Sequence, residues 1–164
     1  MARVVLISFV ALICVLPALV SASRPVRNPF VVHGKVVCDT CCAGFETTAT
    51  TPVKDAIVRL ECKNRDTLEE VYSDVRKTDR DGAYEFTVME DHEDQLCQTQ
   101  LVSSGQKDCS KILAGRERAN VIVTNNNGII SSDRFANNLV FVRNQPMSGC
   151  AQVLQQYKLD DEDA

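Results

Sequence analysis

Seven of the eight cysteines follow the apolar N-terminus, and three of them are crowded into Cys38-Asp-Thr-Cys41-Cys42. A Cys-x-x-Cys pair can be a redox couple, half of a zinc site or the ends of two disulfides. A zinc site needs a second close pair or histidines at ligand spacing, but the other cysteines are isolated and the only histidines are His33 and His92. A thioredoxin-like redox pair lies in a βαβ unit, and no helical pattern surrounds this stretch. Structural disulfides are therefore favoured.

The N-terminus supports this interpretation. Arg3 precedes an apolar run from Val4 to Val20 that ends in small residues, which is the order of a secretory signal peptide. We place cleavage after Ala22, so that residues 1–22 are the signal peptide. A membrane anchor is the alternative, but the run contains Pro17 and no basic stop follows it. The mature chain is thus predicted to be secreted to the extracellular space, where cysteines normally form disulfides.

Charge and hydropathy exclude two classes of partner, nucleic acid and the membrane interior. Removing Arg3 leaves 17 of the 18 basic residues against 22 acidic ones. No basic run occurs, so nucleic acid is not an expected partner. No later stretch is apolar enough to span a bilayer, and membrane insertion is not expected. The sequence holds no Asn-x-Ser/Thr sequon, which predicts the absence of N-glycosylation.

Short alternating runs predict an all-β fold. Seven strands are expected at Phe30–Cys38, Ala56–Lys63, Glu70–Lys77, Ala83–Met89, Leu96–Ser103, Asn120–Thr124 and Leu139–Arg143. Gly34 is expected to form a bulge or kink. Asp81-Gly82 is expected to reverse the chain in a hairpin between the third and fourth strands. Such a set of strands predicts an antiparallel β-sandwich or a small β-barrel.

The remaining segments frame one domain. Residues 23–29 read as an extended leader and residues 30–152 as the β domain. Residues 153–164 are expected to form a short helical turn, marked by Val153, Leu154 and Tyr157, followed by an acidic tail.

Catalytic residues are not predicted. His92 lies within Glu90-Asp-His-Glu-Asp94, where a surface imidazole is the ordinary interpretation, and His33 lies in a predicted strand. No serine occupies a Gly-x-Ser-x-Gly elbow. Asp79-x-Asp81-Gly82 resembles part of an EF-hand loop, but Lys and Val stand at the first and twelfth positions of that loop. We therefore predict no enzyme, no cofactor and no metal site.

The stretch His33-Gly-Lys-Val-Val-Cys-Asp-Thr-Cys-Cys-Ala-Gly-Phe45 resembles the signature of the olive-pollen Ole e I family, in which a Gly and a short strand precede Cys-Asp-Thr-Cys-Arg-Ala-Gly-Phe. The likeness covers essentially the whole mature domain and all six family cysteines in order. It continues through Leu60–Lys63, Gly82–Tyr84, Asp91–His92, Cys97, Leu101–Cys109 and Cys150–Val153. The resemblance implies a secreted plant β protein, immunoglobulin-like or transthyretin-like, with no enzymatic activity assigned.

Six cysteines allow 15 pairings, and spacing alone does not choose among them. The resemblance implies Cys38–Cys109, Cys41–Cys150 and Cys62–Cys97. Where the family usually has Arg after the second cysteine, this chain has Cys42, which is therefore the seventh and unpaired thiol. Neighbouring side chains of an extended segment point to opposite sides, so Cys42 is expected to face outward. An exposed thiol predicts a Cys42-linked homodimer or a mixed disulfide with a small thiol, and a buried, inert thiol is the alternative.

The resemblance also implies a function. Family members are pollen proteins linked to hydration, germination and tube growth, and they include allergens. We expect an interaction or signalling ligand whose partner is a cell-surface receptor kinase or a cell-wall component. The alternative is a carrier of a small molecule or carbohydrate in the barrel mouth, with Phe86 and Phe141 facing the bound ligand.

Overall fold

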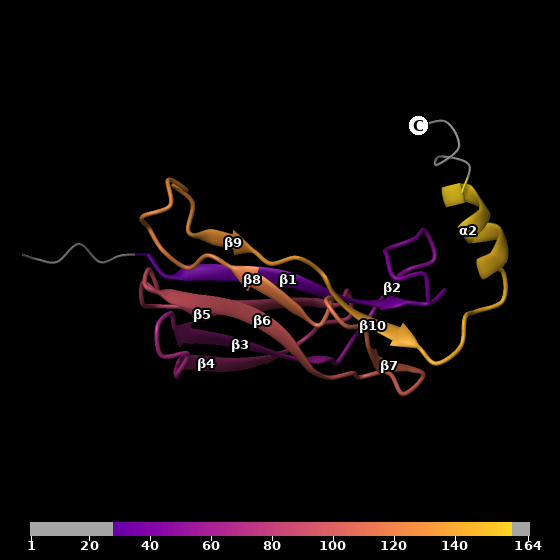
Figure 1. The fold of residues 1–164 in the computed structure, drawn as a ribbon, viewed down its shortest axis with the longest axis horizontal. Helices are drawn as coiled ribbons and strands as arrows, with labels where there is room; N and C mark the ends of the chain where they lie inside the picture. Colours follow the sequence, from indigo (N-terminus) through magenta and orange to yellow (C-terminus); the bar gives the residue numbers. More distant parts are fainter. Residues whose placement is uncertain (1–27, 159–164) are drawn as a thin grey trace, which may run out of the picture.

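The computed structural model describes residues 28–158. The expected signal peptide, most of the expected leader and the acidic tail at 159–164 lie outside the described residues. Within residues 28–158 the chain forms ten strands and one helix, arranged as two sheets (Figure 1). The all-β prediction is confirmed. No helix in this described range is long and apolar enough to cross a membrane.

The larger sheet has six strands. They are β1 (Phe30–Asp39), β2 (Thr51–Pro52), β5 (Ala83–Val88), β7 (Cys109–Ile112), β9 (Asp133–Phe135) and β10 (Leu139–Arg143). β1 is its centre, because the first half of β1 pairs with β5 and β9 and the second half with β10 and β2.

The smaller sheet has four strands in the order β4-β3-β6-β8. They are β3 (Ile57–Asn64), β4 (Glu70–Lys77), β6 (Gln95–Ser103) and β8 (Arg118–Val121). All of its ladders are antiparallel. β8 was predicted at Asn120–Thr124; in the structure it begins two residues earlier, at Arg118, and ends at Val121.

The molecule is a sandwich and not a closed barrel. The predicted antiparallel pairing holds for most ladders, but in the larger sheet β1 runs parallel to both β9 and β10. Three strands were not predicted from the sequence: β2, β7 and β9. Each has only two to four residues, which is too short for an alternating pattern to stand out.

The hairpin expected at Asp81-Gly82 is not formed. β4 pairs with β3 and β5 pairs with β1, so this turn carries the chain from one sheet to the other. Gly82 has φ of +70°, and a Cβ atom here would lie 2.5 Å from the carbonyl oxygen of Val36. The turn prediction is therefore correct locally, but the strands on its two sides belong to different layers.

The predicted inward face of β3 is confirmed, because Val58, Leu60 and Cys62 are fully buried, as is Ala56 just before the strand. On the other face Glu61 is also buried, so the alternation is incomplete there. The bulge expected at Gly34 is absent, because the β1–β5 ladder runs through Gly34 without a register shift. The glycine instead makes room for the ring of Tyr84, whose hydroxyl oxygen would lie 2.2 Å from a Cβ atom at position 34.

Phe86 and Phe141 lie in the packed core, with 0% and 1% of their surface exposed. They cannot line a barrel mouth, and the carrier hypothesis in that form is wrong. Tyr84 crosses the core, where its hydroxyl donates to Thr99 Oγ1 on β6 at 3.0 Å. This hydrogen bond joins the two sheets.

The helix α2 (Cys150–Lys158) is longer than the expected turn and begins three residues earlier. It lies with β2, β7 and β10 at one end of the sandwich (Figure 1). Its first residue is bonded to Cys41, and Tyr157 accepts a hydrogen bond from the Thr48 amide at 3.1 Å. The ring of Tyr157 also meets that of Phe45 edge to face.

Candidate functional site

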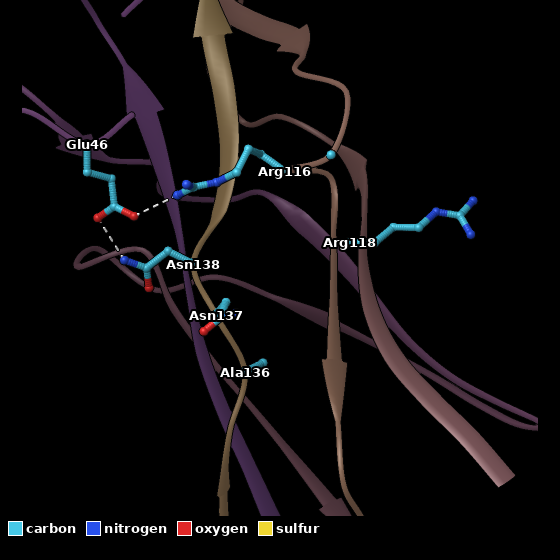
Figure 2. Close-up of a pocket in the computed structure, with 7 residues that line it drawn as sticks. Glu46, Arg116, Arg118, Ala136, Asn137 and Asn138 are labelled. Atoms are coloured by element: carbon cyan, nitrogen blue, oxygen red, sulfur yellow. Dashed lines mark hydrogen bonds and ion pairs between the residues drawn. The ribbon is translucent and has the colours of Figure 1, made fainter. Parts of the chain in front are cut away.

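A polar cleft of about 440 Å³ lies where three distant segments meet (Figure 2). Glu46 comes from the loop after β1, Arg116 from the loop between β7 and β8, and Asn138 from the residue before β10. The Glu46 carboxylate accepts from Arg116 at 2.9 Å and from the Asn138 side-chain amide at 2.9 Å. One acidic side chain therefore fixes both partners.

Two further groups at this cleft have hydrogen-bonding capacity to spare. The Arg118 side chain points away from the Glu46–Arg116 pair in Figure 2, and its guanidinium makes no ion pair or hydrogen bond with any described residue. Asn137, next to Asn138 in the chain, also lines the cleft. A guanidinium and an amide in this arrangement suit a carboxylate, a hydroxyl-rich ligand or a protein surface.

A second groove, of about 600 Å³, adjoins the cleft through Ala136 and Asn138. Its lining includes Tyr84 and the exposed ring of Phe135. The imidazole of His33 stacks on Phe135 with ring centroids 5.3 Å apart.

His33 also connects three strands. Its ring nitrogens lie 3.4 Å from a Glu85 carboxylate oxygen on β5 and 3.1 Å from Asp133 on β9. The hydrogen bond from His33, together with that from the Ser131 hydroxyl, lowers the pKa of Asp133. The imidazole is thus a bridge between strands, which its place in β1 alone did not reveal.

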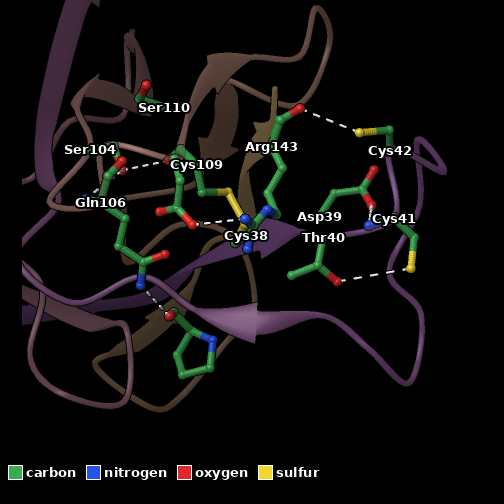
Figure 3. The surroundings of a disulfide bond; sticks show 12 residues. Cys38, Asp39, Thr40, Cys41, Cys42, Ser104, Gln106, Cys109, Ser110 and Arg143 are labelled. Carbon is green, nitrogen blue, oxygen red and sulfur yellow. Dashed lines mark hydrogen bonds and ion pairs between the residues drawn. A yellow bond between two sulfur atoms is a disulfide. The ribbon is translucent and has the colours of Figure 1, made fainter. Parts of the chain in front are cut away.

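The cysteine-rich turn that follows β1 is held by its own side chains (Figure 3). The Asp39 carboxylate, 1% exposed, accepts from the backbone amides of Cys41 and Gly44 at 3.1 and 2.8 Å. Thr40 Oγ1 donates to the carbonyl of Ala49 at 2.7 Å. These bonds fix the start of the loop that carries Glu46.

Three disulfides are formed, and they are the pairs that the family resemblance implies: Cys38–Cys109, Cys41–Cys150 and Cys62–Cys97. The first two lie at the cleft end of the molecule. Cys38–Cys109 fastens β7, after which the chain reaches Arg116, and Cys41–Cys150 fastens α2 to the turn before Glu46. These two disulfides therefore fasten the segments that lead to Arg116 and Glu46.

Cys42 is the free thiol among the described cysteines, and it is exposed. Its backbone has φ of +54°, and its Sγ lies 3.3 Å from the carbonyl oxygen of Arg143, to which the thiol can donate (Figure 3). The residue faces outward in the structure. The homodimer expected from it remains a prediction.

The interpretation of His92 as a surface imidazole is wrong, since only 4% of the residue is exposed. Its backbone amide donates to the Val123 carbonyl at 2.8 Å, which draws the acidic loop over the end of the smaller sheet. A ring nitrogen of His92 and the sulfurs of Cys62 and Cys97 lie within 4.8 Å of one another. The run of acids around His92 gave no signal of this.

Two serine hydroxyls near the Cys38–Cys109 disulfide are engaged in hydrogen bonds to backbone carbonyls. Ser104 Oγ donates to the Cys109 carbonyl at 2.7 Å, and Ser110 Oγ donates to the Lys107 carbonyl at 3.3 Å. A serine nucleophile requires a base within hydrogen-bond reach. Among the described residues the imidazole nitrogens of His33 and His92 have acidic or amide side chains as their hydrogen-bonding partners. Neither Ser104 nor Ser110 is therefore hydrogen bonded to a histidine among the described residues.

Comparison with known proteins gives a consistent result. Residues 28–158 match the family described as "Pollen protein Ole e 1 like". The chain is 42% identical over 157 residues to the protein Downstream of FLC of Arabidopsis thaliana, covering 94% of this chain and 96% of that one. It is 41% identical over 153 residues to Pollen-specific protein C13 of Zea mays, covering 92% and 89%. The crystal structure of the major plantain pollen allergen Pla l 1 superposes with a TM-score of 0.67 at 30% identity, covering 74% of this chain and 99% of that one.

Proposed function

Because the chain belongs to the family of pollen proteins like Ole e 1, we propose that it is a secreted, non-enzymatic ligand of the plant extracellular space. It acts in pollen hydration, germination or tube growth by binding a cell-surface receptor kinase or a cell-wall component. The surface that makes this contact is the polar cleft at Glu46, Arg116 and Asn138.

The observation that carries the proposal is the unpaired Arg118 guanidinium beside a fixed polar lining. A cation that already has an internal partner gains little from binding, whereas Arg118 keeps its donors for a ligand. The Glu46–Arg116 bond and the disulfides Cys38–Cys109 and Cys41–Cys150 hold the lining in one arrangement. Little ordering entropy is then lost on binding.

The extracellular setting is supported by the disulfides and by the relatives. Three disulfides in one small domain are typical of secreted proteins. A relative in maize is named as pollen-specific, and relatives in Chenopodium album and Lolium perenne are named as pollen allergens. We therefore propose expression in pollen and a capacity to act as an allergen.

Arg118→Glu tests the proposal. Purified protein with its disulfides formed is added to germinating pollen, tube growth is recorded, and a photo-activated cross-linker captures the partner at the plasma membrane or wall. Arg80→Glu is the matched control, because the Arg80 side chain is 87% exposed on a turn outside the cleft lining. We expect Arg118→Glu alone to lose both the growth response and the cross-link.

Equal responses from the two variants would contradict the proposed surface. Substrate turnover by the purified protein that disappears in His33→Gln would contradict the non-enzymatic assignment.

A carrier function has one observation in its favour, the groove lined by His33, Tyr84 and Phe135. An aromatic ring that is 77% exposed can stack on a flat or carbohydrate ligand. In this second candidate function, saturable binding of a small ligand is lost in Phe135→Ser and retained in Ile130→Ser. Ile130 is fully exposed and does not line that groove.

A further inference from the structure

The Cys62–Cys97 disulfide differs from the other two in its surroundings. Cys62 and Cys97 lie directly opposite each other in the β3–β6 ladder, with Cα atoms 4.0 Å apart. The loop between β5 and β6 brings His92 to the same place, and one ligand atom from each of the three residues lies within 4.8 Å of the others. Two sulfurs and an imidazole nitrogen at this spacing are the donor set of a zinc site.

One ring nitrogen of His92 has no hydrogen-bonding partner among the described residues. Nδ1 of His92 is hydrogen bonded to Gln95 Oε1 at 2.5 Å, whereas Nε2 is buried and has no partner. Buried polar atoms are nearly always paired, so an orphaned one calls for an explanation. A hydrogen bond to one ring nitrogen that leaves the other free is the usual arrangement of a histidine ligand.

The imidazole is also held in place before any ligand arrives. The His92 amide donates to the Val123 carbonyl, and the Gln95 amide donates to the His92 carbonyl at 3.1 Å. The ring of Tyr72 packs against the imidazole with centroids 5.1 Å apart. The nitrogen donor is therefore preorganised, and only the sulfurs have to change state.

We propose that Cys62, Cys97 and His92 form a redox-gated metal site. With the disulfide closed, the sulfurs are bonded to each other. After reduction, two thiolates and the imidazole bind a divalent, borderline-soft cation of the Zn²⁺ class, and the fourth position is open to water or another ligand.

The reductant is an external dithiol of the thioredoxin class. Its thiolate attacks one sulfur, the bond between Cys62 and Cys97 breaks, and a mixed disulfide forms; the second thiol of the reductant then displaces the protein sulfur. Two electrons pass to the protein, two protons end on the cysteines, and the reductant leaves as a disulfide. Metal binding then displaces those two protons.

The fold supports this step. Cys62 and Cys97 are 0% and 5% exposed, so the dithiol reaches them when this end of the β3–β6 ladder opens locally. Once the disulfide is open, β3 stays paired with β4 and β6 stays paired with β8. The β3–β6 ladder itself continues on from Leu60↔Thr99. The strands are thus not held by the disulfide alone.

The test uses Zn²⁺ alone, with Co²⁺ as a spectroscopic probe. Cys42→Arg is the background, which removes the free thiol. The protein is treated with a dithiol, alkylation mapping identifies the open pair, and native mass spectrometry records bound metal. We expect one Zn²⁺ per chain with the loss of two protons, and a tetrahedral thiolate–Co²⁺ spectrum.

His92→Gln should lower the metal affinity by at least about tenfold, which is the loss seen even when outer-shell partners of a metal site are removed. His33→Gln, the matched control, should leave it unchanged. If Cys62 and Cys97 are mapped as thiols and no metal binds, or if His92→Gln binds equally well, the proposal is overturned.

Circular dichroism shows whether the reduced protein keeps its fold. If it unfolds, Cys62→His in the same background replaces the reduced protein, because it offers two imidazoles and one thiol without a reductant. We expect it to bind Zn²⁺ with the other two disulfides intact, and to lose binding when His92→Gln is added. Failure of Cys62→His to bind Zn²⁺ would also overturn the proposal.

Discussion

The two places where cysteines meet in this molecule differ in what else holds the chain there. At the cleft end, β7 is a strand of four residues, and β10 is its only ladder partner among the described strands. Cys38–Cys109 is therefore a principal tie of β7 to the core. Cys62–Cys97 instead joins two long strands that are already paired along their length and flanked by further strands.

A disulfide thus has a different role in each of the two regions. At the cleft end it positions irregular segments that carry the candidate contact residues, Glu46 and Arg116. In the ladder it is surrounded by hydrogen bonds that hold the strands without it, which is what makes a reversible disulfide physically reasonable there.

The largest expected effect separates these regions by stability. Cys38→Ala/Cys109→Ala should lower the free energy of unfolding by about 4 kcal/mol, because a long closed loop is opened in the unfolded chain. Cys62→Ala/Cys97→Ala should cost about 0.6 kcal/mol less, since its sequence separation is 35 and not 71. Urea denaturation followed by circular dichroism measures both. A greater loss for the ladder pair would reverse the comparison.

The next largest loss of stability is expected from removing the hydrogen bond that joins the two sheets, from Tyr84 to Thr99. Tyr84→Phe removes the bond to Thr99 and should cost about 1 kcal/mol. Burial raises the pKa of Tyr84 from 10.0 to about 12, so the folded state holds the phenol proton more tightly than the unfolded chain. The resulting stabilisation is complete below pH 10 and is lost as the pH rises through 12.

Unfolding free energies measured across this alkaline range should therefore decline in wild type and decline less in Tyr84→Phe. Parallel declines in the two proteins would show that Tyr84 does not report on the packing between the sheets.

A smaller effect is expected on the outer face of the ladder region. Burial alone would raise the pKa of Glu61, but its hydrogen bonds to Lys63 and Gln98 and the charges of Lys63 and Arg59 outweigh this, and the pKa falls below 4.5. The ionised carboxylate thus stabilises the fold above pH 4.5, and this contribution is lost as the pH falls through the folded-state pKa.

Glu61→Gln should therefore cost about 0.5 kcal/mol at neutral pH, a value reduced by the partial exposure of Lys63. In acid, below the folded-state pKa, the difference from wild type should vanish. Thermal denaturation at both pH values checks this, and a cost that persists in acid would assign the effect to shape and not to charge.

The smallest effect on stability is expected at Cys42. The residue is exposed and outside the core, so Cys42→Arg should change the unfolding free energy by no more than about 0.5 kcal/mol. A larger effect is expected on the covalent state of the protein. Non-reducing electrophoresis and intact-mass measurement should show a dimer or a thiol adduct in wild type and neither in Cys42→Arg. A wild-type monomer without an adduct or native-state thiol labelling would support an inert thiol.

Much of the fold follows from local pattern. The bounds Glu70–Lys77 and Leu139–Arg143 were predicted as the structure has them. Leu139–Arg143 is a run of Leu, Val and Phe that identifies a strand by itself, whereas Glu70–Lys77 has a weaker, mixed pattern. β9 has three residues, Asp133–Phe135, and owes its place to pairing with β1, which no local pattern encodes.

The candidate site could not be predicted in the same way. Arg116 and Asn138 are 70 and 92 residues from Glu46 along the chain, and only the topology brings them together. The burial of His92 likewise depends on a bond to Val123, a residue beyond β6 and β8. The cysteine set was informative because the family resemblance supplied a pairing that spacing did not.

The central claim is that the cleft at Glu46 and Arg116, whose segments are fastened by Cys38–Cys109 and Cys41–Cys150, is the contact surface. Its most direct test is the equilibrium affinity of the labelled, oxidised protein for membranes and walls of germinating pollen. We expect saturable binding that Arg118→Glu weakens by at least tenfold, about 1.4 kcal/mol. Binding should be lost in Cys41→Ala/Cys150→Ala and retained in Cys62→Ala/Cys97→Ala and Arg80→Glu. Undiminished binding by Arg118→Glu, or a loss confined to the Cys62–Cys97 variant, would contradict the account.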